Sequence, residues 1–395
     1  MRLLMLNNEF PPLGGGTGTV NRAMLERFAQ VPELKIDLVT SALGKSPQEE
    51  CFSSAITLHK VPVRNKNMHH SSNRELIEYF VRGLAKAVKL HRQKKYDFCF
   101  AWSAVPAGAI ALVLRRSAGL RYILRVCGPD IPGFERRYQA IHFFVSPLIR
   151  QIWRSADKLV AKSLREIEMI RALDTSISCT LIANGVDLNV FKPVQSMLED
   201  RPLKLLCVGR LIERKGQHYL IDAVKRLRDE GIDVKLDLVG TGDAQTANQS
   251  QVARLELTDR VKFLGYIPRE QIAAHYVAAD VFVLPSYNEG MSVALLEAMA
   301  AGLPGIVTAN AGTPELIEAG VNGLVFNWGD VNTLTAHLKR FARDRALVGR
   351  MGAASRTRAA LFSWDAAALR YLALFKEIVG CPVAAAANLS TESNR

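Results

Sequence analysis

The chain has 395 residues and carries 51 Lys and Arg against 38 Asp and Glu, a net charge of +13. Its length predicts two to three domains, and its hydrophobic fraction of 49% excludes a disordered or collagen-like chain. The charge is uneven, because residues 1–200 hold 28 basic and 18 acidic side chains (+10), whereas residues 201–395 hold 23 and 20 (+3). The basic first half indicates an anionic partner: nucleic acid, acidic lipid or a phosphorylated substrate.

The cysteines and the hydropathy pattern indicate the compartment. The six cysteines are scattered, without a Cys-x-x-Cys pair or a His cluster at zinc spacing, so we expect free, buried thiols. They are Cys51, Cys99, Cys127, Cys179, Cys207 and Cys381. The longest apolar stretch, Val105–Leu114, is too short to span a bilayer, and residues 1–6 are too short for a signal peptide. We expect a cytoplasmic protein, with peripheral membrane contact left open.

Short apolar runs alternate with helical periodicity along both halves of the chain, which predicts βαβ units and parallel sheets. Strands of the first half are predicted at Arg2–Leu6, Lys35–Thr40, Phe98–Trp102, Arg121–Val126 and Lys158–Ala161. Strands of the second half are predicted at Leu203–Val208, Lys235–Val239, Val261–Leu264, Val281–Leu284 and Gly305–Thr308. Because the repetition occurs twice, the predicted fold class is α/β, with two doubly wound, Rossmann-like domains facing a cleft.

The domain boundary is predicted at Pro193, ahead of a polar stretch from Gln195 to Arg201. The chain is expected to divide into a first domain (1–193), a second domain (194–362), a C-terminal helix (363–380) and a disordered tail (381–395). Ligands bind such sheets at the carboxyl ends of the strands, so the loops that follow the strands are where functional residues are expected.

The first of these loops, Pro11–Thr19, is rich in glycine and precedes a helix predicted from Val20 to Gln30. Glycines let backbone N–H groups approach a ligand, and a helix N-terminus favours anions. The loop therefore predicts phosphate contact, although a flexible turn has the same composition. Its glycines are off register from Gly-x-Gly-x-x-Gly and no acidic residue ends the second strand, which argues against a nicotinamide cofactor.

The segment Lys60–Lys95 holds ten Lys or Arg and two Glu. From Arg74 to Lys95 it is predicted to be an amphipathic helix with six apolar residues on one side: Leu76, Ile77, Phe80, Val81, Leu84 and Val88. Two interpretations stay open, a core-packed helix with a solvated basic face, or a surface for anionic lipid or a phosphorylated acceptor. Nucleic acid is not expected, because no recognition-helix motif or interleaving of aromatic and basic residues occurs.

The loop Val208–Gly216 follows the first strand of the second half. The side chains of Arg210 and Lys215 can converge on one point. The planar guanidinium of the arginine and the ammonium of the lysine together suit a diphosphate. A solvated basic loop is the alternative.

The loop 285–292 lies between a predicted strand and a helix from Val293 to Ala301. Glu289 precedes this helix, and Glu297 lies within it among apolar neighbours. Burying an unpaired carboxylate is costly, so a polar ligand is predicted at Glu297. A salt bridge to an unidentified partner is the alternative.

Four segments that stand in order along the chain resemble those of one enzyme family. They are Pro11-Pro12-x-x-Gly15-Gly16, Asn184-Gly185-Val186-Asp187-x-x-x-Phe191, Val208-Gly209-Arg210-Leu211-x-x-x-Lys215-Gly216 and Glu289-Gly290-x(6)-Glu297-Ala298. Together they resemble the retaining nucleotide-sugar glycosyltransferases of family 4, also called group 1, which have the GT-B fold. The resemblance covers nearly the whole chain and is strongest from Asn184 to Gly312.

The resemblance implies a role for each matching residue. Gly15 and Gly16 would contact the donor phosphate, Arg210 and Lys215 would hold the diphosphate as it leaves, and Glu289 would lie near the reacting carbon. The remaining donor contacts would be the backbone of Gly290, Met291, Ser292 and Val293, the Glu297 carboxylate on the ribose, and the Ile267 backbone at the base. The C-terminal helix around Trp364 would cross back to the first domain.

Two fixed cations and a helix dipole can stabilise the charge that develops on a leaving diphosphate. They can replace a metal ion, and the sequence contains no Asp-x-Asp motif, so we expect no metal and no cofactor besides the donor. The diphosphate itself can take the acceptor's proton, so no strong protein base is required.

The sequence departs from many relatives after the fourth strand, where a His-Gly-x-Asp segment is usual. Here the segment is Cys127-Gly128-Pro129-Asp130, so Cys127 stands where that His would face the donor sugar. Asp130 is a candidate catalytic residue that would take over part of the role. An Asp after Pro is also a common turn former.

The predicted function is transfer of a hexose-type sugar, with retention, from a UDP- or GDP-sugar to a hydroxyl of a glycan or lipid-linked glycan. The candidate catalytic residues are Glu289, Arg210, Lys215 and Asp130. Expected partners are the donor, the acceptor and an anionic membrane surface, and nucleic acid is not among them. The alternatives are a GT-B phosphorylase or sugar-nucleotide epimerase and a non-catalytic nucleotide-sugar-binding subunit.

Overall fold

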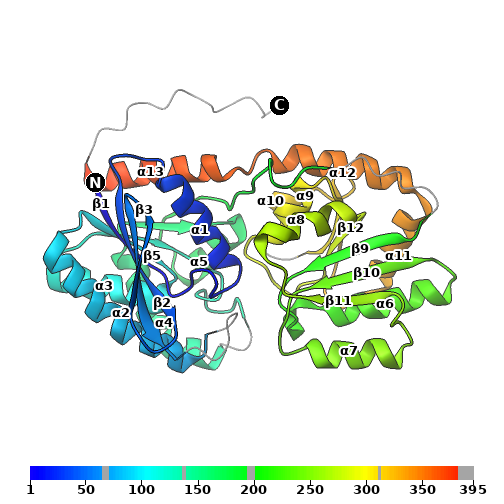
Figure 1. The fold of residues 1–395 in the computed structure, drawn as a ribbon, viewed down its shortest axis with the longest axis horizontal. Coiled ribbons are helices and arrows are strands. Elements are labelled where there is room, and N and C mark those ends of the chain that lie inside the picture. The colour runs from blue at the N-terminus through cyan, green and yellow to red at the C-terminus, as the bar shows by residue number, and fades with distance from the viewer. Residues whose placement is uncertain (65–70, 136–138, 194–200, 310–312, 381–395) are drawn as a thin grey trace.

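The computed structural model describes residues 1–64, 71–135, 139–193, 201–309 and 313–380. These residues form two α/β halves that lie side by side along the longest axis of the molecule (Figure 1). The predicted tail 381–395 and most of the polar stretch after Pro193 lie outside the described residues. The predicted fold class, α/β with two doubly wound domains, is confirmed.

The first sheet has the strand order β3-β4-β2-β1-β5-β6-β7-β8, and its neighbouring strands are parallel except for the β3–β4 pair. Its strands are β1 (Arg2–Leu6), β2 (Lys35–Leu43), β3 (Gln48–Ser53), β4 (Ile56–Val63), β5 (Phe98–Trp102), β6 (Tyr122–Arg125), β7 (Lys158–Ala161) and β8 (Cys179–Leu181). Its helices are α1 (Gly16–Phe28), α2 (Asn73–Lys94), α3 (Ala109–Ala118), α4 (Gln139–Ser155) and α5 (Leu164–Leu173).

The second sheet is wholly parallel, with the strand order β11-β10-β9-β12-β13-β14. Its strands are β9 (Leu203–Val208), β10 (Val234–Val239), β11 (Val261–Gly265), β12 (Val281–Leu284), β13 (Gly305–Thr308) and β14 (Gly323–Phe326). Its helices are α6 (Gln217–Asp229), α7 (Gln245–Arg254), α8 (Arg269–Ala278), α9 (Val293–Ala300), α10 (Thr313–Leu316), α11 (Val331–Arg343) and α12 (Arg345–Ala359).

Both faces of the first sheet are buried, which explains why its central strands are continuously apolar. In β1, Leu4 and Leu6 enter one core cluster, whereas Leu3 and Met5 enter the cluster on the opposite face. This alternation follows from the period of two in a strand. The runs that satisfy it, such as β5, were predictable from hydropathy alone.

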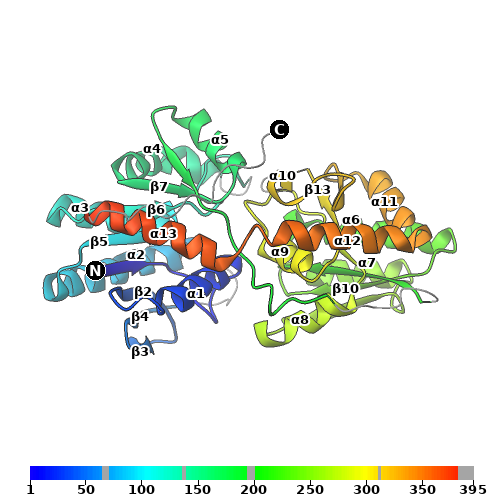
Figure 2. The same ribbon diagram turned by 90° about the horizontal axis from the view of Figure 1, so that it is seen from above.

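The C-terminal helix α13 (Trp364–Val379) leaves the second half and packs on the first (Figures 1 and 2). Its Tyr371 and Phe375 are buried in the same cluster as Phe28 of α1 and Phe100 of β5. The Phe375 ring lies 5.1 Å from that of Phe98 and 5.5 Å from that of Phe100, measured between centroids. The chain therefore passes between the two halves twice, once between β8 and β9 and once between α12 and α13.

The two crossings touch each other at Gly185. The Val186 N–H donates to the Phe362 carbonyl at 3.0 Å, just before α13 begins. A Cβ on Gly185 would lie 2.4 Å from the Trp364 nitrogen, so only glycine fits between the two backbones. The Asn184-Gly185 motif thus has a structural role at the hinge between the halves.

Some elements differ from the sequence expectations. Strands β3, β4, β8 and β14 were not predicted; β3 and β4 carry many polar residues, and β8 is only 3 residues long. The helix α1 begins at Gly16, not at Val20. Burial of Gly18, Val20 and Asn21 against the sheet outweighs the weak helix propensity of this Gly- and Thr-rich turn.

The expected apolar side of α2 is wrong in part. The residues that face the core are Tyr79, Gly83, Ala87 and Leu90, together with Glu75 in the capping box at the start of the helix. Ile77 and Val81 point outward and are 64% and 59% exposed. The core-facing stripe includes a glycine and an alanine, which a hydropathy pattern underweights.

Five of the six cysteines lie in the described residues, and all five are free. Cys99 and Cys207 are buried as expected, whereas Cys51 is exposed. Among the helices of the described ranges, none combines the length and hydropathy that a bilayer crossing requires.

Candidate active site between the two domains

The loops that follow β1, β6 and β7 meet the loops that follow β9 and β12 between the two halves of the molecule. We call this region the interdomain site. It contains the glycine loop (11–19), the Cys127–Asp130 turn, Lys162, the basic loop (208–216) and the acidic loop (285–292). Because the strands that carry these loops run parallel within each sheet, their carboxyl ends gather the loops along one edge of each sheet.

The glycine loop ends in an uncapped helix N-terminus. Gly15 is the N-cap of α1 and, having no side chain, supplies no side-chain cap to the first turn. A Cβ on Gly15 or Gly16 would meet nothing within 4 Å, so there is open space beside the first turn of α1. With 13 residues of aligned peptide dipoles behind it, this terminus is suited to an anion.

Glu9, a residue that the sequence analysis did not single out, lies against this loop. A Cβ on Gly14 would be 2.7 Å from the Glu9 carboxylate. Burial raises the pKa of Glu9, although the Arg210 charge and the Gly15 N–H both act to lower it. The Glu9 carboxylate of the first half is thus electrostatically coupled to Arg210 of the second half.

Lys215 and Glu289 form an ion pair in the interdomain site, with the Lys215 Nζ bonded to the Glu289 Oε1. Each side chain is 14% exposed. Burial raises the pKa of Glu289, but the Lys215 and Arg214 charges outweigh burial and lower the pKa below its ordinary value. Glu289 is therefore ionised at neutral pH.

The acidic loop passes close to the first half at Gly290. A Cβ there would be 2.4 Å from the Lys162 Cε and 2.6 Å from the Glu166 Oε1, so a larger residue would have to displace these two side chains. Lys162 and Glu166 form a buried ion pair at the start of α5. This pair, which matches none of the motifs described above, brings a cation and a carboxylate of the first half to the acidic loop.

The residues after Gly290 begin α9. Met291 is buried, the Ser292 hydroxyl accepts the Leu295 N–H at 3.2 Å as the N-cap, and Val293 packs against the core of the first half. The Asn184 amide donates to the Met291 carbonyl at 3.1 Å. The start of α9 is thus fixed from both domains.

Glu297 lies one turn further along α9 and faces α8. Its Oε2 accepts the Tyr276 hydroxyl at 2.9 Å. Burial raises the pKa of Glu297 to about 7, against the lowering effects of Tyr276 and Arg269. Its partner is therefore a phenol, which the sequence analysis did not identify. Ile267 is half-buried beside Tyr266, which is 59% exposed.

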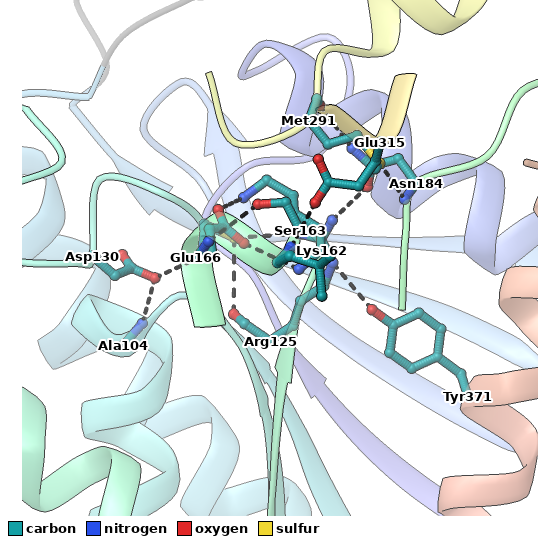
Figure 3. Close-up of polar contacts among 12 residues, drawn as sticks. Ala104, Arg125, Asp130, Lys162, Ser163, Glu166, Asn184, Met291, Glu315 and Tyr371 are labelled. Atoms are coloured by element: carbon teal, nitrogen blue, oxygen red, sulfur yellow. Dashed lines mark hydrogen bonds and ion pairs between the residues drawn. The ribbon is translucent and has the colours of Figure 1, made fainter. Parts of the chain in front are cut away.

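Asp130 organises the turn after β6. Its Oδ2 accepts the Ala104 N–H at 2.9 Å and the Cys127 N–H at 3.0 Å, as Figure 3 shows for Ala104. Burial raises the pKa of Asp130 to about 7. Burial also raises the pKa of Cys127 to about 12, so its thiol is protonated at neutral pH.

Arg125 lies beneath this turn and links three parts of the chain (Figure 3). Its guanidinium donates to the Tyr371 hydroxyl of α13 at 3.1 Å and to the Asn184 Oδ1 at 2.7 Å. It also stacks over the Trp102 ring at 4.5 Å. Through Asn184 and Met291, the buried Arg125 is connected to the acidic loop of the second half.

Other polar contacts cross between the halves. Arg214 reaches the Glu135 Oε1 at 3.2 Å, and the Asn288 Nδ2 donates to the Phe134 carbonyl at 2.8 Å. The Glu315 Oε1 accepts the Leu164 N–H at 2.6 Å, at the start of α5. These contacts hold the loops of the interdomain site in register.

The structure brings the predicted site residues Gly15, Gly16, Arg210, Lys215, Glu289 and Gly290 to the interdomain site. Asp130 lies on the first-half side of the site and is used in backbone hydrogen bonds. Within the described ranges, no group of three or more His, Cys, Asp or Glu side chains could hold a metal ion.

Two family models match adjoining parts of the chain. The family described as Glycosyltransferase Family 4 matches residues 14–190, and the family described as Glycosyl transferases group 1 matches residues 191–358. Together the two matches run without a gap from the glycine loop to the end of α12.

Individual proteins are similar to the chain as well. A Salmonella typhimurium protein named as the colanic acid biosynthesis glycosyltransferase WcaL is 30% identical over 247 residues, and the aligned region spans 60% of this chain and 60% of that relative. The GDP-mannose-dependent alpha-(1-6)-phosphatidylinositol monomannoside mannosyltransferase of Mycolicibacterium smegmatis is 27% identical over 90% of this chain and 92% of its own length. The solved sucrose-phosphate synthase of Thermosynechococcus elongatus superposes with a TM-score of 0.85 at 24% identity, over 96% of this chain and 99% of that one.

Proposed function

Because the chain belongs to the group 1 glycosyltransferases of family 4 and has their GT-B fold, we propose that it is a retaining hexosyltransferase that uses a UDP- or GDP-sugar without a metal ion. The proposed acceptor is a hydroxyl of a glycan or a lipid-linked glycan. The names of two relatives support this choice, since one refers to colanic acid biosynthesis and the other to a GDP-mannose-dependent transfer to a phosphatidylinositol glycan.

The observation that carries the proposal is the Lys215–Glu289 pair near the N-terminus of α9. The pair supplies an ionised carboxylate and a cation in the same place. Transfer of a glycosyl group develops positive charge on the sugar and negative charge on the leaving diphosphate. A carboxylate for the first and a cation for the second are what the transition state requires.

In the proposed mechanism the acceptor oxygen forms a bond to the anomeric carbon while the bond from that carbon to the diphosphate oxygen breaks. The electron pair of the broken bond goes to the diphosphate, and that oxygen takes the proton of the acceptor hydroxyl. Attack and departure on the same face of the sugar retain the anomeric configuration. Arg210, Lys215 and the N-terminus of α1 at Gly15 and Gly16 would hold the diphosphate.

The remaining donor contacts follow the loops of the second half. The backbone N–H groups at the start of α9, from Gly290 to Val293, would hold the sugar and phosphate. Glu297 would accept hydrogen bonds from the ribose, with Tyr276 fixing its orientation, and the Ile267 backbone would contact the base. Asp130 would shape the sugar end of the site through the Ala104 and Cys127 N–H groups that it holds.

The test is nucleotide selectivity followed by donor hydrolysis. In a thermal-shift screen we expect UDP or GDP, and not ADP, to raise the unfolding temperature, because a ligand that binds only the folded state stabilises it. A panel of labelled UDP- and GDP-sugars scored for hydrolysis without acceptor would then identify the sugar. If neither UDP nor GDP shifts the unfolding temperature, the proposed donor class is wrong.

We also propose peripheral contact with an anionic membrane through the first domain. Beside the basic residues of α2, the outward Ile77 and Val81 and the exposed Phe143 and Phe144 of α4 offer apolar contacts. Basic and apolar groups on one domain favour anionic interfaces. Flotation with anionic vesicles at low and high salt tests this idea, and no binding at low salt would count against it.

A further inference from the structure

The strands β2 and β4 extend beyond the rest of the first sheet. Leu6, the last residue of β1, pairs with Val39, but β2 continues to Leu43, which pairs with Val63 of β4. This two-stranded extension projects past β1 by four residues, roughly 13 Å. Helix α2 packs along β2 and β4 (Figure 2).

A hollow of about 460 Å³ lies at the end of this extension. It is lined by Gly44, Lys45, Pro62, Val63, Arg64 and Arg82. Its size is within the range of small-molecule sites. The three cations come from three different elements, the ends of β2 and β4 and the middle of α2, so folding brings them together.

The cations of the hollow are mostly uncompensated. Among the residues that the structure describes, the side chains of Lys45 and Arg82 form no ion pair or hydrogen bond. Arg64 lies close to Glu78, because the Glu78 Oε2 accepts the backbone N–H of Arg64 at 2.9 Å.

The other nearby carboxylates are engaged elsewhere. Glu49 contacts His59 and Lys86, and Glu50 pairs with Lys60 at 2.5 Å. One carboxylate therefore faces the three cations of the hollow.

Three cationic side chains line the hollow, and a carboxylate lies near one of them. The remaining positive charge favours a bound anion. Arginine forks and a lysine ammonium suit the oxygens of phosphate or carboxylate groups. Pro62, which is half-buried and lines the hollow, adds an apolar wall that suits a ligand with a carbon skeleton beside its charge. A free inorganic anion would leave this wall unused.

The position of the hollow relates it to the acceptor. It lies in the first domain at the carboxyl ends of the strands, on the same edge as the glycine loop. Strand spacing and the four-residue extension together put it roughly 15 Å from the end of β1. A group bound there is too far from the glycine loop to contact the donor diphosphate.

We propose that this hollow binds a phosphate or carboxylate group of the acceptor, at a distance from the hydroxyl that receives the sugar. The proposal rests on the proposed glycosyltransferase function and adds the chemical class of the acceptor. It places the charge on a remote part of that acceptor, such as an acidic unit of a glycan or the phosphate of a lipid.

The test compares wild type with Arg82→Glu and Lys45→Ala, with UDP or GDP present to fill the donor site. The control is Arg116→Ala, which removes an exposed cation of α3 in the same domain. The soluble probes are a hexose 6-phosphate and the uncharged hexose. The lipid probes are phosphatidylinositol-containing vesicles and pure phosphatidylcholine vesicles.

We expect wild type and Arg116→Ala to bind at least one charged probe and neither uncharged counterpart. Arg82→Glu and Lys45→Ala should weaken that binding tenfold or more, and added salt should weaken it in wild type. Binding of the hexose phosphate would identify a soluble or glycan-borne anion, and binding of the vesicles alone would identify a lipid phosphate.

Equal binding by wild type and Arg82→Glu, or no binding of either charged probe by wild type, would overturn the proposal. The unfolding temperature of each variant shows whether it is folded. Failure of UDP and GDP to stabilise wild type would instead contradict the proposed function, so the two failures are separable.

Discussion

Glu289 is a carboxylate whose charge depends on two neighbouring cations, Lys215 and Arg214. Without them, burial alone would push its pKa upward and reduce the ionised fraction. Pairing with these cations therefore keeps the Glu289 carboxylate negatively charged beside the place where the resemblance puts the donor sugar. That arrangement suits the proposed role of Glu289, which is to stabilise charge and not to transfer a proton.

We expect Glu289→Ala to bind the donor nucleotide but to lose transfer, with kcat reduced by about 100-fold or more. The nucleotide contacts assigned to Arg210, Glu297 and the α1 N-terminus remain in this variant. Nucleotide affinity is measured by calorimetry and transfer with a labelled donor. Retained transfer in Glu289→Ala would remove this residue from the proposed mechanism.

Asp130 makes stability depend on pH. Its pKa in the folded chain is about 7, compared with 3.8 in a simple peptide, because burial disfavours the charged form. The folded state therefore prefers protonated Asp130. This preference stabilises the fold fully below the unfolded pKa and is lost as pH rises through about 7.

We expect Asp130→Asn, which does not titrate, to gain stability relative to wild type between pH 4 and pH 7. The difference should grow by at most about 1.4 kcal/mol per pH unit and level off above pH 7. Urea unfolding of both proteins across this range measures it. Glu297, whose pKa is also about 7, titrates in both proteins, so its effect cancels in the difference. A difference that does not change with pH would contradict the shifted pKa of Asp130.

At the scale of single elements, α13 shows how tertiary packing joins distant parts of the sequence. Phe375 is fully buried against Phe28, Phe98 and Phe100, although it is more than 270 residues away from them in sequence. Leu369 of the same helix is 67% exposed. One helix therefore offers a buried position and a matched exposed one.

We expect Phe375→Ala to lower the free energy of unfolding of the first domain by about 3 to 5 kcal/mol, because it removes a buried ring and leaves a cavity. Leu369→Ala on the exposed side should change it by less than about 0.5 kcal/mol. Urea unfolding followed by tryptophan fluorescence measures both. Similar values for the two variants would show that α13 does not contribute to the core of the first domain.

The sequence predicted elements best where burial on both faces makes a strand continuously apolar, as in β1, β5 and β12. It missed β3 and β4, where Glu49, Glu50 and Lys60 make local patterns polar and the pairing is decided by the neighbouring β2. The start of α1 was misplaced because packing of Val20 and Ala23 overrides the weak propensity of the glycines.

The residues of the candidate site also divide into those that local sequence patterns identify and those that only distant contacts reveal. Arg210, Lys215, Glu289 and Glu297 were identified because their motifs have fixed spacing within a single loop or helix. Glu9, Lys162 and Tyr276 were missed because their significance depends on contacts with residues far away in sequence. Arg125 meets Tyr371 at a separation of 246 residues, which no local pattern reports.

At the scale of the whole molecule, the two halves meet through polar contacts between loops, through Val293 on the core of the first half, and through two chain crossings. Arg214 of the second half is central to them. It reaches the Glu135 carboxylate of the first half, donates to the Asn288 carbonyl at 3.0 Å and helps keep Glu289 ionised. The contact that joins the halves is thus coupled to the charge of the candidate site.

We expect Arg214→Ala to favour a more open arrangement of the two halves, because Glu135, whose side chain is 2% exposed, would lose the cationic contact that reaches it from the second half. Losing a cationic contact at a buried carboxylate destabilises the closed arrangement, and separation of the halves lets water solvate the carboxylate instead. Small-angle X-ray scattering should show a larger radius of gyration without nucleotide, and a smaller increase with it. The matched control is Arg165→Ala, whose partner Glu168 lies on the same exposed helix face. Scattering curves of Arg214→Ala that superpose on those of wild type would show that this contact does not hold the halves together.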